Sequence, residues 1–269
     1  MYVGDISSVE LNDGRRMPML GLGTSRLEGA YDAVKSALEL GYRHIDTAAM
    51  YGNEEAVGRA VRDSGLKREE IFITTKLRND GHRDVDHEVD TSLELLGLDY
   101  VDLYLIHWPM PERIASWKTL AKLVTGDKIK SIGVSNFTIR HLKELFSNSR
   151  VKPAVNQVEF HPFVYQPALL DFNGDNGIQV IAYSPMTRAN KLDNPTVAEV
   201  AASTGQTPAQ ILLRWSVQHG VAVIPKSASR QHQAANMDIF DWELSKEDMA
   251  KLDGLYDGFR VTEDPESYP

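Results

Sequence analysis

The sequence predicts an α/β fold of the (β/α)8 barrel type. Eight short apolar runs, most of them rich in β-branched residues, read as buried strands, and amphipathic helical segments separate them. The chain has 269 residues, which suits a single barrel of about 250 residues. No stretch resembles a linker, so we expect one domain spanning residues 1–269.

The expected strands recur at the spacing of strand–helix units. They are residues 19–21, 42–45, 71–75, 101–107, 128–135, 154–160, 178–184 and 221–226. Helical spacing of apolar residues is clearest at 30–38, 85–96 and 114–124. This alternation predicts a parallel sheet with right-handed crossovers. Because periodicity does not report closure, an open doubly wound sheet is the alternative.

A hairpin is expected ahead of the first barrel strand. Asn12, Asp13 and Gly14 are typical turn residues, and they separate residues 8–11 from residues 15–19. We expect this hairpin to close the floor of the barrel.

Composition and charge exclude several classes of function. The chain has 38 acidic and 29 basic residues, and it lacks a basic block long enough for a nucleic-acid partner. Cysteine is absent, which excludes disulfides and a cysteine nucleophile. Residues 1–10 do not resemble a leader, and no stretch approaches the roughly 18 apolar residues of a membrane span. We therefore expect a cytoplasmic protein without a membrane partner.

Polar residues follow successive strands, at the barrel end where function resides. Asp46 and Tyr51 follow the second expected strand, Lys76 the third, and His107 ends the fourth. Reduction of a carbonyl needs a proton donor, and a tyrosine can serve if a nearby cation favours its phenolate. Lys76 would supply that cation and Asp46 would pair with it. His107 would orient the carbonyl or share the proton.

Each of these residues also has a purely structural interpretation. Asp46 could cap the helix after the second strand, and Tyr51 could be a packing residue. Lys76 could be solvated, and His107 could be a core histidine with satisfied hydrogen bonds. Their position after consecutive strands favours the catalytic interpretation of the four together.

Two other patterns point to different chemistry. The Gly-Leu-Gly stretch at 21–23 has Arg26 at the sixth position, so the dinucleotide fingerprint is incomplete and a Rossmann fold is not expected. A metal-dependent hydrolase is suggested by four potential zinc ligands, namely His44, Asp46, His107 and His161. No His-x-His pair occurs, and a lysine and a tyrosine occupy places where more ligands would be wanted. We expect no metal.

Motifs along nearly the whole chain resemble the aldo-keto reductase family, in the family's order. They are LGYRHIDTA at 40–48 with YGNE at 51–54, ITTK at 73–76, LIHWP at 105–109, IGVSNF at 132–137, NQVE at 156–159, YSP at 183–185 and IPKS at 224–227. The resemblance is to short-loop bacterial members of the 2,5-diketogluconate reductase type, since the segment 107–129 is short.

The resemblance implies a monomeric oxidoreductase that reduces small aldehydes or ketones by hydride transfer from NADPH. Its catalytic set would be Asp46, Tyr51, Lys76 and His107, with Tyr51 as the proton donor. Two alternatives stay open: a non-catalytic module of the same fold that senses a bound cofactor, and the hydrolase.

The resemblance also implies which residues hold the nicotinamide end of the cofactor. Ser135, Asn136 and Gln157 would bind the carboxamide, and Tyr183 would stack on the ring. The expected site at this end also includes Gly23, Thr24 and Asp46.

The phosphate end follows from the same resemblance. Ser184 would bind the phosphate bridge, and Lys226 with Ser227 would bind the adenosine 2′-phosphate. Asn236 would contact the adenine edge.

One position departs from the family at the 2′-phosphate. An arginine is usual six residues after the lysine, but the chain has His232 there. A neutral imidazole lacks both the charge and the fork, so NADH is expected as a possible second cofactor. Arg230 is the candidate substitute.

The expected substrate pocket comprises Ser25, Met50, Trp108 and Met110. Ser25 stands where many relatives carry an aromatic residue, and the tail after Tyr256 is short and polar. The sequence therefore predicts a shallow, open site.

Overall fold

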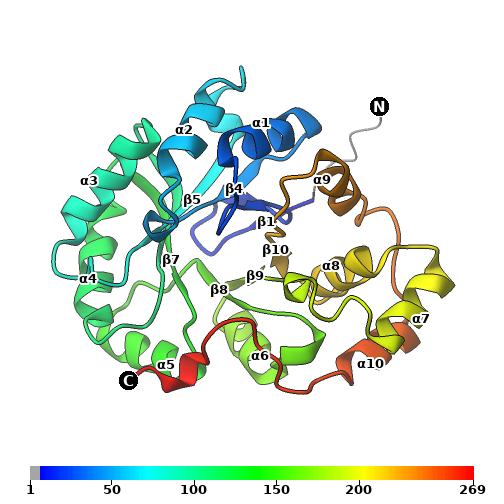
Figure 1. Ribbon diagram of the computed structural model, residues 1–269. Coiled ribbons are helices and arrows are strands. Elements are labelled where there is room, and N and C mark those ends of the chain that lie inside the picture. The colour runs from blue at the N-terminus through cyan, green and yellow to red at the C-terminus, as the bar shows by residue number, and fades with distance from the viewer. Residues whose placement is uncertain (1–6) are drawn as a thin grey trace.

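The computed structural model describes residues 7–269, and part of the segment considered above for a leader lies outside that range. Within it, eight parallel strands are surrounded by a ring of helices (Figure 1). The strands are β3 (Leu22–Gly23), β4 (His44–Asp46), β5 (Phe72–Leu77), β6 (Val101–Ile106), β7 (Ile129–Ser135), β8 (Val155–Glu159), β9 (Gln179–Tyr183) and β10 (Ala222–Val223). Each strand pairs with the next one in the chain.

The first and last strands meet, which closes the sheet into a barrel. Leu20 forms a parallel bridge with Val223. The backbone N–H of Gly21 donates to the carbonyl of Val223 (2.9 Å), and that of Gly23 donates to Pro225 (3.1 Å). An open doubly wound sheet would leave these edges unpaired, so that alternative is wrong and the (β/α)8 fold is confirmed.

Helices cover the outer face of the barrel strands. They are α1 (Ala30–Leu40), α2 (Glu54–Arg62), α3 (Val85–Leu96), α4 (Arg113–Leu123), α5 (Ile139–Asn148), α6 (Pro167–Asp175), α7 (Pro195–Thr204), α8 (Pro208–Gln218), α9 (Arg230–Met237) and α10 (Lys246–Asp253). Short 3-10 helices are η1 (Ala49–Tyr51), η2 (Arg68–Glu70), η3 (Pro162–Val164), η4 (Thr187–Ala189) and η5 (Pro265–Ser267).

Local sequence signals fix several helix ends. Thr207 and Gln210 form a capping box at the start of α8, where Pro208 needs no hydrogen-bond partner for its nitrogen. Gly97 ends α3 in the left-handed region, with φ of 61°. The apolar faces of the helices pack with the outer faces of the strands in one continuous core.

The predicted hairpin is confirmed and fills the lower end of the barrel. β1 (Ser8–Glu10) pairs antiparallel with β2 (Arg16–Pro18). Leu11, Met17 and Met19 join a second apolar cluster inside the barrel, with residues such as Leu103 and Ile181. These side chains occupy the interior that the strands alone would leave empty.

Some strand boundaries differ from the prediction. β3 begins at Leu22, after the expected run at 19–21. Lys76 lies inside β5 instead of after it. These shifts change only where a strand begins or ends. Each site residue still belongs to the expected strand and lies at the same end of the barrel.

Among residues 7–269, no helix has both the length and the apolar character that a membrane crossing requires.

Candidate active site

A cavity of about 1160 Å³ opens at the carboxyl ends of the barrel strands. Most of the residues expected at the site line it, namely Gly23, Ser25, Asp46, Met50, Tyr51, His107, Trp108, Ser135, Asn136, Gln157, Tyr183, Ser184, Lys226, Ser227, His232 and Asn236. Four expected residues are not part of its wall: Thr24, Lys76, Met110 and Arg230.

A buried ion pair lies beneath the cavity. Nζ of Lys76 donates to Oδ1 of Asp46 (2.5 Å) and to the carbonyl of Thr47 (2.8 Å), and both charged side chains are almost wholly buried. Burial disfavours the charge on Lys76, but Asp46 and Tyr51 outweigh it, so the pKa of Lys76 is raised. Lys76 is therefore charged and not solvated.

Asp46 does not cap a helix, because both of its oxygens are used inside the barrel. Its Oδ2 accepts from Nε2 of Gln157 (2.7 Å), while the residue at the N-cap of α2 is Asn53. The hydroxyl of Thr24 is fully buried and donates to the backbone carbonyl of Asp46 (3.0 Å). Thr24 thus fixes the end of β4. Its side chain was expected at the cofactor site, but Thr24 is not part of the cavity wall.

Tyr51 ends η1, with its ring centroid 5.1 Å from Nζ of Lys76. Burial raises the pKa of Tyr51, and Lys76 and Ser25 offset only part of that rise. Lys76 does favour the phenolate, as expected, because it lowers the pKa of Tyr51, but burial raises that pKa by more than the lysine lowers it. Tyr51 keeps its proton near neutral pH.

His107 follows β6 and packs edge-on against Tyr51, with ring centroids 5.6 Å apart. Burial, with a smaller effect from Lys76, lowers the pKa of His107 to about 3. The imidazole is therefore neutral near pH 7. It can orient a polar atom in the cavity, but it does not carry the second proton that sharing would require.

The amide residues at the centre of the cavity hold one another in place. Asn136 has a left-handed backbone, with φ of 63°, and its Nδ2 donates to the carbonyl of His107 (2.9 Å). Its Oδ1 accepts from the hydroxyl of Tyr183 (2.7 Å). Ser135 donates to the carbonyl of Gln157 (2.8 Å). These hydrogen bonds fix the orientation of the polar groups at the centre of the cavity.

Arg230 is turned away from the cavity. Its Nη1 lies 3.0 Å from Oε2 of Glu39 and 3.3 Å from the carbonyl of Ser36, both on α1. Arg230 therefore does not line the cavity in this structure, and its replacement of the missing arginine at the phosphate end stays a prediction. An ion pair on the outside of the barrel already uses the guanidinium.

Two cations at the cavity wall were not identified from the sequence. Arg26 and Arg188 both line the cavity, and among residues 7–269 neither forms an ion pair with a carboxylate. The carbonyl of Arg26 accepts from Nζ of Lys226 (3.3 Å). Arg26 stands at the sixth position of the pattern that begins with Gly21, which was a usable signal, whereas no sequence pattern singled out Arg188.

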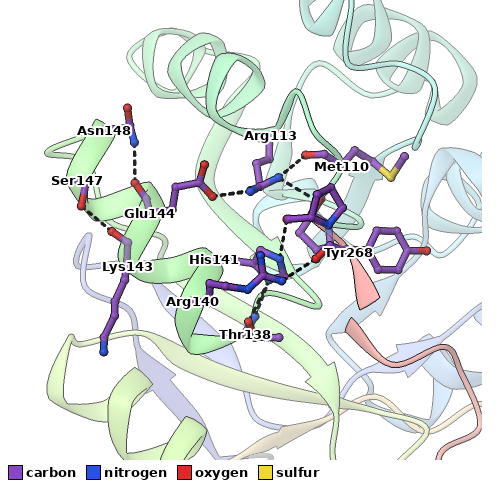
Figure 2. Close-up of polar contacts among 12 residues, drawn as sticks. Met110, Arg113, Thr138, Arg140, His141, Lys143, Glu144, Ser147, Asn148 and Tyr268 are labelled. Carbon is purple, nitrogen blue, oxygen red and sulfur yellow. Dashed lines mark hydrogen bonds and ion pairs between the residues drawn. The ribbon is translucent and has the colours of Figure 1, made fainter. Parts of the chain in front are cut away.

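The carboxyl-terminal segment covers one side of the cavity. After α10 this segment runs past α6 to α5 (Figure 1). Its residue Thr262 lines the cavity. Tyr268 stacks on Trp108, with ring centroids 5.0 Å apart. The carbonyl of Tyr268 accepts from Arg140 (2.6 Å), as Figure 2 shows. The expectation of a shallow, open site is wrong on this side.

Met110 lies outside the cavity wall. Its carbonyl accepts from Nη1 of Arg113 (3.1 Å), in the loop before α4 (Figure 2). The chain turns after Pro109, and this removes Met110 from the expected substrate pocket.

The four potential zinc ligands do not form a metal site. Within residues 7–269, no group of three or more histidine, aspartate or glutamate side chains is arranged to hold a metal ion. Nε2 of His44 lies 3.0 Å from Oγ1 of Thr74, and Nε2 of His161 lies 2.9 Å from Oε1 of Glu159.

Known sequences and structures resemble this chain over nearly its full length. The model of the aldo/keto reductase family matches residues 19–257. Glyoxal reductase of Bacillus subtilis (strain 168) is 46% identical, with 96% of each chain covered. An aldo-keto reductase of Mycolicibacterium vanbaalenii is 48% identical, with 98% of this chain and 97% of that protein covered.

Solved structures share the fold closely. An aldo-keto reductase from a Medee basin deep-sea metagenome library has a TM-score of 0.94 and 43% identity, covering 98% of this chain and 100% of that one. The aldo-keto reductase of Bombyx mori, in complex with NADP, has a TM-score of 0.91 and 37% identity, covering 98% of this chain and 97% of that one.

Proposed function

The chain belongs to the aldo/keto reductase family, and on that premise we propose that it reduces small aldehydes or ketones to alcohols with NADPH, using Tyr51 as proton donor. The observation that carries the proposal is the buried Lys76–Asp46 pair beneath Tyr51 at the cavity wall. A charged lysine in this place is not hydrated, because its side chain is buried. It serves a neighbouring group that becomes negative during the reaction.

The cavity fits a dinucleotide together with a small substrate. Its volume of about 1160 Å³ is larger than that of most small-ligand pockets, which hold roughly 300–1,000 Å³. Amide groups of Asn136 and Gln157 suit a carboxamide, and the ring of Tyr183 suits stacking on nicotinamide. Lys226 and Ser227 suit a 2′-phosphate. Bound NADPH supplies the hydride.

The proton is delivered by Tyr51 to the carbonyl oxygen as that oxygen becomes an alkoxide. An alkoxide is a stronger base than a phenolate, so a tyrosine with a raised pKa is still acidic enough to protonate it. Lys76 then stabilises the phenolate that remains. Asp46, which Gln157 holds by a hydrogen bond, and the carbonyl of Thr47 keep Lys76 in place, and neutral His107 orients the carbonyl oxygen of the substrate.

The substrate wall favours small carbonyl compounds. Tyr268 stacks on Trp108, and Ser25, a small residue, lines the same cavity. The Bacillus subtilis relative is named for glyoxal reduction. We propose glyoxals and other short aldehydes as the substrate class for this chain.

The decisive experiment measures oxidation of NADPH and, separately, of NADH with methylglyoxal and a panel of short aldehydes and ketones. Turnover with NADPH and a carbonyl substrate supports the proposal. Tight NADPH binding without turnover across the panel would favour the cofactor-sensing module instead. The proposal includes a monomeric, cytoplasmic enzyme, which size-exclusion chromatography and cell fractionation test.

A further inference from the structure

Glu159, at the end of β8, fastens the carboxyl-terminal segment to the barrel. It is buried, and its carboxylate accepts from Nε2 of His161 (2.9 Å), the backbone N–H of Val261 (2.7 Å), and both the N–H (3.2 Å) and hydroxyl (2.7 Å) of Thr262. Burial alone would raise the pKa of Glu159, but these donors outweigh it and lower that pKa. The carboxylate is ionised and therefore only accepts hydrogen bonds.

Thr262 connects this anchor to the proposed nicotinamide site. Its Oγ1 lies 2.8 Å from the hydroxyl of Tyr183, and that hydroxyl lies 2.7 Å from Oδ1 of Asn136. A chain of three polar contacts thus runs from Asn136 through Tyr183 and Thr262 to Glu159. Both Tyr183 and Thr262 line the cavity.

The three polar contacts cannot all be hydrogen bonds at once, because too few hydroxyl hydrogens are present to donate. Thr262 has one hydroxyl hydrogen, which goes to the ionised Glu159, so Thr262 can only accept from Tyr183. Asn136 is oriented by the bond from its Nδ2 to the carbonyl of His107, so its Oδ1 can only accept as well. The single hydroxyl hydrogen of Tyr183 therefore has two competing acceptors.

We propose that Thr262 is a positioning residue of the nicotinamide site, because it accepts the hydroxyl hydrogen of Tyr183 and so releases Oδ1 of Asn136 to the ligand. This inference rests on the proposed function. Glu159 keeps Thr262 in the accepting role. The ring of Tyr183 stays fixed by Thr262 while Asn136 receives an N–H from the bound carboxamide.

Removing the Thr262 hydroxyl should weaken the binding only of ligands that carry the carboxamide. Thr262→Val keeps the shape of the side chain but leaves Asn136 as the only acceptor for Tyr183. The carboxamide must then displace an internal hydrogen bond. A ligand without nicotinamide, such as adenosine 2′,5′-bisphosphate, makes no demand on Asn136 and should bind as before.

The test compares dissociation constants of NADPH and adenosine 2′,5′-bisphosphate by calorimetry. For Thr262→Val we expect the constant for NADPH to rise about 2- to 10-fold, with the constant for the fragment unchanged. Thr262→Ser should restore NADPH binding. Asp257→Asn is the matched control, because it breaks an exposed ion pair with Lys191 (2.9 Å) on the same segment without touching Tyr183.

A second comparison isolates the route through Tyr183. In a Tyr183→Phe background, Thr262→Val should cause no further loss, because the hydroxyl that links the two is gone. The inference would be overturned, and the proposed function left standing, if a Thr262→Val protein with an unchanged melting temperature bound both ligands equally more weakly. The same holds if it bound both as tightly as before. Failure of the unmodified protein to bind either ligand would overturn the proposed function as well.

Discussion

The ammonium group of Lys76 lies 2.5 Å from Oδ1 of Asp46, and almost no water reaches either side chain. Removing two charges from water costs several kcal/mol per ion, and their attraction repays this only when the remaining hydrogen bonds are also made. Gln157 and the carbonyl of Thr47 supply those bonds. The pair therefore adds little net stability, and its value lies in holding a positive charge under Tyr51.

Breaking this pair from one side should be costly, whereas replacing both partners should not. Lys76→Met leaves a buried unpaired carboxylate and should lower the free energy of unfolding by about 3–5 kcal/mol. Adding Asp46→Asn should recover most of that loss. Urea unfolding measures both. The exposed ion pair Lys128–Asp90 is the control, because it contributes less than about 1 kcal/mol to the free energy of unfolding. Additive losses at Lys76 and Asp46 would contradict this account.

Loss of the Tyr51 hydroxyl should abolish the proton donor without disturbing the cofactor site. We expect Tyr51→Phe to lower kcat by about 10²- to 10⁴-fold with methylglyoxal, while the dissociation constant of NADPH stays within twofold. Tyr256→Phe makes the same chemical change at an exposed position and should leave kcat unaltered. Unchanged turnover in Tyr51→Phe would refute the role of Tyr51.

Cofactor preference should depend on Lys226 and not on Arg230. A charge-assisted hydrogen bond to a phosphate contributes about 1.5–3 kcal/mol, so Lys226→Met should weaken NADPH binding about 10- to 100-fold with little effect on NADH. Arg230→Met should change the affinity for neither cofactor, because the guanidinium of Arg230 is paired with Glu39. Fluorescence titration of both cofactors decides this. A large loss in Arg230→Met would mean that the guanidinium turns into the site when the ligand binds.

Acid should destabilise the fold before most carboxylates titrate. The pKa of His44 is lowered by burial to about 4, and that of His107 to about 3. In the unfolded chain both titrate near 6.5, so below that pH the unfolded state binds more protons. The stability present above pH 6.5 is therefore lost as pH falls toward the folded-state pKa values.

The expected slope is up to about 1.4 kcal/mol per pH unit for each of these histidines. Chemical unfolding at pH 7, 6 and 5 measures it. His107→Gln should reduce the slope, and His232→Gln, which changes an exposed histidine, should not. A flat profile between pH 7 and 5 would show that neither buried histidine stays neutral.

Backbone strain in the loop after β9 should be relieved by glycine. Ser184, Thr187, Arg188 and Ala189 all have positive φ, and Ala189 is exposed with φ of 68°. A left-handed backbone costs a non-glycine residue roughly 1–2 kcal/mol, so Ala189→Gly should raise stability by up to about 1 kcal/mol. Ala202→Gly, at an exposed position of α7, should lower the stability by a similar amount. Destabilisation by both would indicate that residue 189 is not strained.

Much of the site was predictable from the sequence because the barrel fold places strand ends together. Once the strands were recognised, Asp46, Lys76 and His107 had to share one end of the barrel. The tail was not predictable in the same way. Thr262 reaches the cavity wall through a bond to Glu159, and Tyr268 reaches Trp108 beside a bond to Arg140. Both partners lie about 100 residues or more away in the chain, and no local pattern encodes such contacts.

The order of strands and helices, the hairpin, the family and the side chains that gather at the barrel mouth could all be derived from the sequence. These follow from periodicity, turn residues and motifs, which are local. The closure of the barrel, the pairing of Arg230 with Glu39, and the protonation of Tyr51 and His107 required the three-dimensional structure. Each of those depends on burial and on neighbours distant in the chain, because the free energy of a charge or a hydrogen bond is set by what surrounds it in space.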